Sequence, residues 1–168
     1  MEVSQSHSET RAQGHAPGAL RAAAAHPTLQ EVATLGDGDG LRVWAAGDRA
    51  VLGRVALPSP GRSVAYWPGR AGLLVGLASG AVVYAEGAAP GAGAPGAPRD
   101  AAAPVLSALS VDPSGRRLAV GFEHGVLDLL DISGGPEAGP LPILCTGKGP
   151  AGAIDRIDWS EDGKVLQV

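Results

Sequence analysis

Two sets of glycines repeat with the same two intervals, 40 and 45 residues, along this chain. One set ends short apolar runs, and the other set stands in the turn that follows each run. The first set is Gly36, Gly76 and Gly121, and the second is Gly40, Gly80 and Gly125. Because two independent landmarks share one period, the sequence predicts tandem copies of a single supersecondary unit.

Each copy is expected to be a group of short strands joined by turns. Leu41 and Val43, and likewise Leu118 and Val120, alternate with smaller or polar neighbours, as half-buried strands do. The Asp-Pro-Ser-Gly string at 112–115 is typical of a tight turn. The expected strands are 20–25, 32–35 and 41–44 in the first copy, 63–66, 73–77 and 81–84 in the second, 105–111, 118–122 and 126–130 in the third, and 153–159 in a fourth.

Composition excludes several classes of protein. The 26 glycines and 14 prolines shorten helices and multiply turns. A net charge of −4 provides no basic field for nucleic acid, the N-terminus lacks an apolar core of signal-peptide length, and no apolar run reaches the length of a membrane span. The single cysteine, Cys145, excludes an intramolecular disulfide and a cysteine-based zinc site. We expect a soluble intracellular protein without nucleic-acid or membrane partners.

Segments poor in bulky apolar residues separate the copies. Residues 1–13 are polar and aperiodic, which indicates a disordered tail. The Gly/Ala/Pro-rich stretch 87–104 has prolines that block a helix and nothing large to bury, so it is expected to be a linker. The predicted organisation is a tail at 1–13, two repeats at 14–86, the linker at 87–104, a third repeat at 105–133, a loop with an outer strand at 134–152, and the start of a fourth repeat at 153–168.

Several strings resemble known repeats. Gly14-His15, His26-Pro27, Val32-Ala-Thr-Leu-Gly36 and Leu41-Arg-Val-Trp44 together resemble one WD40 repeat, which forms one blade of a β-propeller. Leu118-Ala-Val-Gly121 after Asp-Pro-Ser-Gly-Arg, and Ile154-Asp-Arg-Ile-Asp-Trp159-Ser-Glu-Asp-Gly163, resemble the propellers of echinoderm microtubule-associated-protein-like proteins. The resemblance covers about residues 14–168. It implies an all-β, open WD40-type propeller fragment of about three blades plus the start of a fourth, with Trp159 as the landmark of the fourth.

In the family's usual blade, a His, a Ser or Thr, a turn Asp and a Trp form a buried hydrogen-bonded tetrad. The resemblance implies His15, Thr34 and Trp44 for three of these positions, but Gly38 stands where the Asp is expected. The later blades depart further, so we expect them to depend on apolar packing alone. Their departures are Ala85-Glu86 and Leu130-Asp131 in place of Trp-Asp, and Gly149-Pro150 in place of Gly-His.

Two glycine-rich strings imitate ligand-binding motifs. Residues 91–96 match the dinucleotide-binding G-x-G-x-x-G, but Pro95 and Pro98 forbid the helix that this motif must open. Asp37 and Asp39 suggest a calcium loop, yet the twelfth position holds an Asp where such a loop needs Glu. A linker and a tight strand–strand turn are the preferred interpretations.

The remaining candidate residues also favour structural roles. The four histidines show no metal-ligand spacing, and Cys145 has no neighbour except Lys148 that would activate it. The three tryptophans are expected in the core or between blades, although Trp67 adjoins Pro68 in a turn that could face solvent. Four arginines scattered over turns are expected to form a solvated rim that could meet an acidic partner: Arg62, Arg70, Arg116 and Arg117. The sequence therefore predicts no catalytic, cofactor or metal site.

The expected function is that of a non-enzymatic protein-binding module. The resemblance implies a contribution to tubulin or microtubule binding, and thus a cytoplasmic, cytoskeleton-associated protein with no small-molecule substrate. Two alternatives stay open: a generic WD40 scaffold fragment for another protein partner, and a truncated isoform without autonomous binding.

Overall fold

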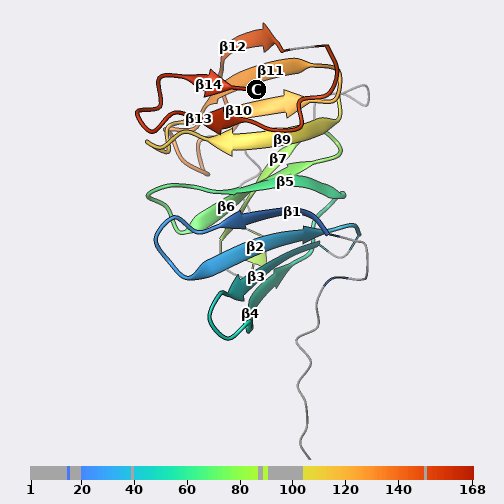
Figure 1. The fold of residues 1–168 in the computed structure, drawn as a ribbon, viewed down its shortest axis with the longest axis vertical. Helices are drawn as coiled ribbons and strands as arrows, with labels where there is room; N and C mark the ends of the chain where they lie inside the picture. Colours follow the sequence, from blue (N-terminus) through green and yellow to red (C-terminus); the bar gives the residue numbers. More distant parts are fainter. Residues whose placement is uncertain (1–14, 16–19, 39, 87–88, 91–103, 150) are drawn as a thin grey trace, which may run out of the picture.

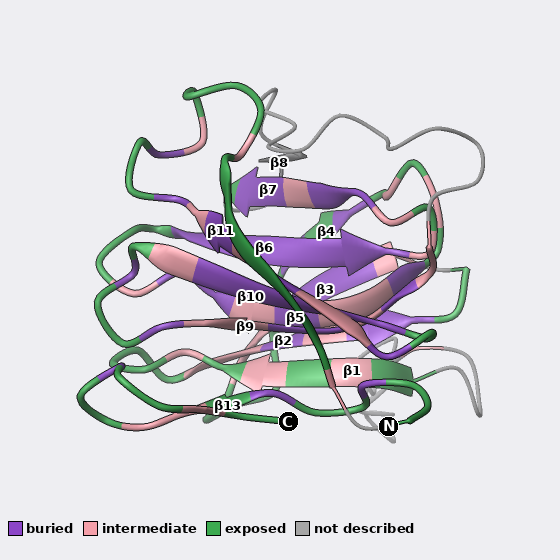
Figure 2. Ribbon diagram, turned by 90° about the horizontal axis from the view of Figure 1, so that it is seen from above, coloured by how far each residue is buried: buried purple, intermediate pink, exposed green. Residues whose placement is uncertain are grey.

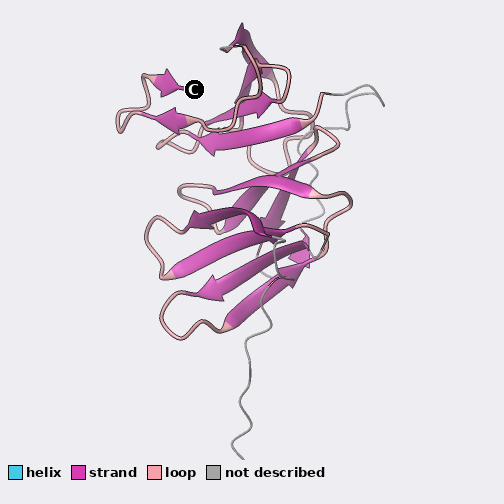
Figure 3. Cartoon of the chain, turned by 45° about the vertical axis from the view of Figure 1, so that its right-hand side comes forward, coloured by secondary structure: helices cyan, strands magenta, loops and turns pink. Residues whose placement is uncertain are grey.

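The computed structural model describes residues 15, 20–38, 40–86, 89–90, 104–149 and 151–168, and every regular element in these ranges is a β-strand (Figure 3). The strands form three antiparallel four-stranded sheets and one two-stranded pair, each built from strands consecutive in the chain. We call these sheets blades one to three and the pair the start of blade four. This is the layout expected when each repeat closes its own hydrogen-bond ladder through short hairpin connections.

The strand bounds follow the repeats. Blade one contains β1 (Leu20–Ala25), β2 (Glu31–Gly36), β3 (Gly40–Ala45) and β4 (Val51–Val55). Blade two contains β5 (Gly61–Tyr66), β6 (Gly72–Leu77), β7 (Val82–Glu86) and β8 (Ala89–Pro90). Blade three contains β9 (Leu106–Val111), β10 (Arg117–Phe122), β11 (Val126–Asp131) and β12 (Ile143–Lys148). The start of blade four contains β13 (Asp158–Trp159) and β14 (Leu166–Gln167).

The first strands of the blades gather side by side. β1 lies beside β5, β5 lies beside β9, and β13 lies beside β9, so the blades stack in chain order (Figure 1). Each first strand is an edge of its own sheet, and the fourth strand is the opposite edge. The stack therefore has an inner edge made of first strands and an outer edge made of fourth strands, and it is open rather than closed into a ring.

The hydrophobic cores lie between consecutive blades. One core joins blades one and two, a second joins blades two and three, and a third joins blade three to the start of blade four. Buried residues accordingly concentrate on the middle strands, whereas β12 at the outer edge is exposed along its whole length (Figure 2). With few aromatic residues available, these cores consist mainly of Leu, Val, Ile and Ala.

Strand β6 shows how the sequence builds a double-sided blade. All six of its residues are buried. Because successive side chains point to opposite faces of a strand, Leu73, Val75 and Leu77 join the core toward blade one, while Leu74 joins the core toward blade three. Gly76 shares the face of Leu74, and the absence of a side chain there admits Leu106 and Leu109 of β9.

Substitution of Gly76 by alanine is expected to lower the free energy of unfolding by about 2 kcal/mol, because overpacking displaces a tight core. A Cβ atom at this position would lie 2.4 Å from Leu106 Cδ2 and 2.9 Å from Leu109 Cδ2. Urea unfolding measures the difference. Gly147→Ala on the exposed β12 is the matched control, since a Cβ there meets nothing within 4 Å. Equal stability of the two variants would contradict close packing at Gly76.

The structure differs from the sequence-based expectation in three strands. β4 and β8 were not predicted, and Ala89–Pro90 of β8 lie within the expected linker, whose remainder is largely outside the described residues. The expected strand 153–159 is reduced to Asp158–Trp159, because its partner β14 offers only two paired residues. Ahead of β13, Ile154 packs into the third core, and its carbonyl accepts a hydrogen bond of 2.7 Å from Ser107 Oγ. The expected tail at 1–13 lies outside the described residues.

Candidate functional site

The turns that follow the first strands share one backbone hydrogen bond. In each turn the first residue donates its N–H to the carbonyl of the residue five positions later, over 2.9–3.0 Å. These turns lie at the same end of the stack, and we call them together the turn face. The four pairs are His26 with Glu31, Trp67 with Gly72, Asp112 with Arg117, and Ser160 with Val165.

Asp112 organises the turn of blade three. Its carboxylate has no exposed surface, and it accepts hydrogen bonds from Ser114 Oγ at 2.6 Å and from the backbone N–H groups of Arg116 and Arg117 at 2.8 and 2.9 Å. The Arg117 guanidinium adds a charged contact at 3.1 Å. Burial raises the pKa of Asp112, but hydrogen bonds from Ser114, from both backbone N–H groups and from Arg117 outweigh it, so the pKa falls below the ordinary 3.8.

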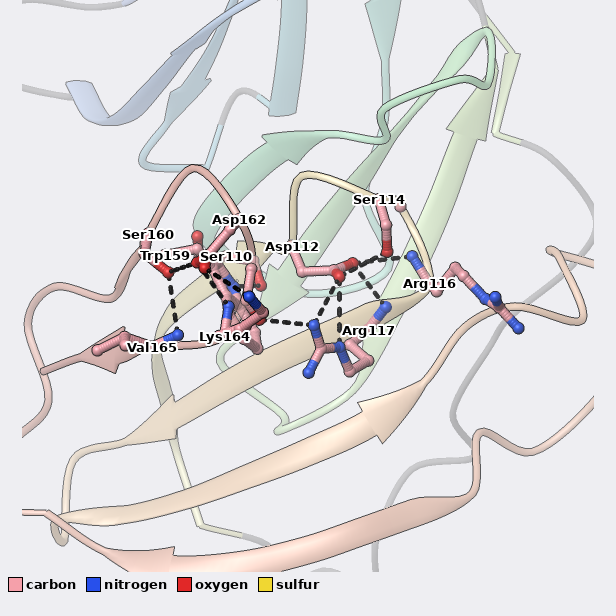
Figure 4. Close-up of polar contacts among 12 residues, drawn as sticks. Ser110, Asp112, Ser114, Arg116, Arg117, Trp159, Ser160, Asp162, Lys164 and Val165 are labelled. Carbon is pink, nitrogen blue, oxygen red and sulfur yellow. Dashed lines mark hydrogen bonds and ion pairs between the residues drawn. The ribbon is translucent and has the colours of Figure 1, made fainter.

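Arg117 carries this network across to the start of blade four (Figure 4). Its Nη2 donates to the carbonyl of Gly163 at 2.6 Å, and its guanidinium lies 5.0 Å from the ring centroid of Trp159. Trp159 in turn donates from Nε1 to the carbonyl of Ser110, at 3.3 Å. The expectation that the later blades depend on apolar packing alone is therefore wrong, because a buried carboxylate and an arginine join blades three and four.

Trp67 makes the corresponding connection between blades two and three. It is 1% exposed, so the expectation that it could face solvent is wrong. Its Nε1 donates to the carbonyl of Gly115 at 2.7 Å, the Tyr84 ring meets it edge-on at 5.8 Å, and Arg70 lies 5.0 Å from its ring centroid. Gly115 has a φ of 67°, and a Cβ atom there would lie 2.4 Å from the Pro68 carbonyl oxygen. The turns of blades two, three and four are thus hydrogen-bonded to one another, and the turn of blade one meets blade two through an edge-on contact between the His26 and Tyr66 rings.

The structure brings together the three residues proposed for a tetrad. Thr34 Oγ1 accepts a hydrogen bond of 2.7 Å from Trp44 Nε1, and it lies 2.7 Å from His15 Nε2. One hydroxyl serves both contacts: it accepts from the indole, and the direction of its bond to the imidazole depends on the tautomer of His15. Gly38 occupies the fourth position with a φ of 85°, and neighbouring Asp37 instead pairs with Arg21. This group lies on the face of blade one that points away from blade two, because Thr34 alternates with the buried Ala33 and Leu35.

The sequence landmarks occupy corresponding places. Gly36, Gly76 and Gly121 lie in the second strands of their blades. Gly121 repeats the packing role of Gly76, because a Cβ atom there would lie 2.6 Å from Ile154 Cγ2 of the next repeat. Trp159 is half-buried beside Arg117.

The four arginines expected on turns separate into two groups. Arg70 and Arg116 are exposed on the turn face, whereas Arg117 is engaged with Asp112 and Gly163. Arg62 lies at the opposite end of the inner strands. There it lines a hollow of about 430 Å³ together with Arg21, Ser107, Glu123 and Asp155. Among the described residues, two positive and two negative side chains line this hollow.

Among the described residues, no group of three His, Cys, Asp or Glu side chains converges as a metal site would require. Cys145 is an exposed free thiol on β12. No helix in the described ranges has the length and apolar character needed to cross a membrane. The polar contacts on the turn face connect structural elements to one another.

Comparison with known proteins identifies the fold. No protein-family model matches the chain. A solved structure, the β-propeller domain of Myceliophteria thermophila Cps50 (Swd1), is similar with a TM-score of 0.67 and 16% sequence identity. The match covers 88% of this chain and 47% of that one, so the chain spans about half the length of the propeller structure. The expected architecture is confirmed: the described residues form an open, all-β part of a β-propeller.

Proposed function

We propose that the chain is a non-enzymatic protein-binding module that presents its turn face to partners. The observation that carries the proposal is a pair of hydrogen bonds that join the turns of adjacent blades. Trp67 donates to the Gly115 carbonyl, and Arg117 donates to the Gly163 carbonyl. A surface held in one conformation before binding loses little conformational entropy when a partner docks. No nucleic-acid, membrane or small-molecule partner is included in the proposal.

Tubulin or assembled microtubules are the partner we propose, with a cytoplasmic, cytoskeleton-associated location. Support comes from the resemblance of the strings at 105–131 and 154–167 to the echinoderm microtubule-associated-protein-like family. It also comes from Arg70 and Arg116, two exposed cations on braced turns that suit an acidic protein surface. Arg70 lies against Gly135, and Arg116 acts electrostatically on Asp131, so the two arginines flank the same loop of blade three.

Reversal of both charges, in the double variant Arg70→Glu/Arg116→Glu, is expected to weaken binding to microtubules by about tenfold, the equivalent of about 1.4 kcal/mol. Each substitution replaces an attraction to an acidic surface by a repulsion. Co-sedimentation with assembled microtubules over a range of tubulin concentrations measures the affinity. The loss should diminish as salt is added, because ions screen exposed charges.

The charge-matched control is Arg54→Glu/Arg156→Glu, which alters two exposed arginines away from the turn face. Thermal unfolding of every variant first establishes that it is folded. If the unaltered chain stays in the supernatant, the microtubule proposal fails. Equal losses in both double variants would mean that net charge, and not the turn face, governs binding. A folded chain that does not bind microtubules would support the alternative of a generic scaffold fragment for another protein partner. An unfolded chain would support the alternative of an isoform without autonomous binding.

A further inference from the structure

An apolar groove opens between blades one and two. Its volume is about 260 Å³. Val43, Leu52 and Gly53 of β3 and β4 form one wall, and Leu73 and Ala85 of blade two form the other. We call it the inter-blade groove. It is separate from the charged hollow at the opposite end of the inner strands, and none of the tetrad residues lines it.

Two leucines on the groove remain exposed. Leu29 in the β1–β2 turn is 55% exposed, and Leu52 on β4 is 52% exposed. Both line the groove, so its entrance is apolar as well as its walls. Exposed leucines beside a concave apolar site are typical of a surface that a partner covers.

Two polar side chains of the groove have no side-chain hydrogen-bond partner among the described residues. Tyr66 is only 9% exposed, and its buried hydroxyl has no hydrogen-bond partner among the described residues. The half-buried carboxylate of Glu31, also on the groove, makes no ion pair or side-chain hydrogen bond within the same part of the chain. Native proteins rarely leave such groups unsatisfied, so an unsatisfied buried hydroxyl and a half-buried carboxylate on residues that line one groove point to a ligand that would satisfy both.

The charge of the groove is negative. His26 accepts hydrogen bonds at Nδ1 from the backbone N–H groups of Thr28 and Leu29, over 3.1 and 2.9 Å. Burial, and then the negative charge of Glu31, raises the pKa of Tyr66 to about 12, which keeps the phenol neutral. Among the described residues that line the groove there is no lysine or arginine, and Glu31 is the one acidic side chain.

We propose that the inter-blade groove receives a lysine or arginine side chain from a protein partner. The aliphatic stem would lie against Val43, Leu52 and Leu73, and the cationic head would donate to the Glu31 carboxylate and the Tyr66 hydroxyl oxygen. Long basic side chains combine an apolar stem with a charged end, which is the distribution of chemistry along this groove. The inference rests on the proposed protein-binding function for the nature of the ligand, but it does not require tubulin as the partner.

Titration of the full chain with Nα-acetyl-lysine N-methylamide, followed by NMR, tests the inference. The matched probe is the norleucine analogue, which keeps a linear aliphatic side chain and lacks the ammonium group. The lysine probe is expected to shift the Leu29, Leu52 and Tyr66 signals saturably, and the norleucine probe to bind at least about tenfold more weakly. An arginine probe distinguishes a preference for guanidinium from one for ammonium.

Two variants assign the contact to the groove. Glu31→Gln is expected to weaken binding of the lysine probe by about tenfold. Binding of the norleucine probe should not change, because the substitution removes only the charge. Glu161→Gln, which neutralises an exposed carboxylate in the β13–β14 turn, should leave both probes unchanged. Tyr66→Phe, which removes the hydroxyl, should weaken binding of the lysine probe severalfold.

Equal binding of the two probes, an unaffected Glu31→Gln variant or no saturable shift would each overturn cation recognition here. None of these outcomes bears on the Arg70 and Arg116 co-sedimentation result. Failure of the groove and failure of the proposed function are therefore distinguishable.

Discussion

Replacement of Asp112 by alanine is expected to lower the free energy of unfolding by about 3 kcal/mol, because several hydrogen-bond donors lose their acceptor at once. The carboxylate has no exposed surface and accepts from two backbone N–H groups, a serine hydroxyl and the Arg117 guanidinium. Arg117 would lose its anionic partner while still reaching for the Gly163 carbonyl. Urea unfolding at neutral pH measures the loss.

The matched control for this effect is Asp162→Ala in the equivalent turn of blade four. Asp162 also accepts from a serine hydroxyl and a backbone N–H, but it is exposed, so its removal should leave the unfolding free energy within error. Since the folded pKa of Asp112 is depressed, its carboxylate stabilises the fold above the ordinary value of 3.8, and this contribution is lost as the pH falls through the lower folded value. The difference between wild type and Asp112→Ala should shrink over that window. A difference that is constant with pH would show that the carboxylate charge is not responsible.

The blade arrangement was predictable because its signals are local and repeated. Gly76 and Gly121 occupy equivalent positions because each leaves room for apolar side chains of the next repeat, so the packing between blades produces a regular spacing in the sequence. β4 was missed although a weak signal exists. Val51, Gly53 and Val55 alternate with the exposed Leu52 and Arg54, but only two of the inward residues have apolar side chains.

The contacts that join one blade to the next were less accessible to sequence analysis. The group of His15, Thr34 and Trp44 was found because a family motif names those positions, whereas no local pattern marks Trp67 or Arg117 as hydrogen-bonding across blades. Trp67 and its acceptor Gly115 are 48 residues apart, and Arg117 and Gly163 are 46 apart. Such residues are brought together only when whole sheets stack on one another. The same stacking places Glu31 and Tyr66 on one groove.

Removal of the Trp67 side chain tests whether the blades form one cooperative unit. Trp67→Ala is expected to lower the free energy of unfolding by about 4 kcal/mol, the range for truncation of a buried tryptophan. The indole is 1% exposed in the core between blades two and three, and it also supplies the hydrogen bond to the Gly115 carbonyl. Urea unfolding followed by far-ultraviolet circular dichroism, which does not depend on the deleted fluorophore, measures the change.

Two further variants separate the packing of Trp67 from its hydrogen bond. Trp67→Phe retains an aromatic ring but leaves the Gly115 carbonyl without its donor, so about 1–2 kcal/mol of the loss should remain. Trp159→Ala removes a half-buried indole whose hydrogen bond to Ser110 is longer, at 3.3 Å, and it should be less damaging than Trp67→Ala. If Trp67→Ala instead unfolds in two steps, blades one and two would form a unit independent of blade three. The turn face would then not be a single braced surface, and the mechanism proposed for partner binding would fail with it.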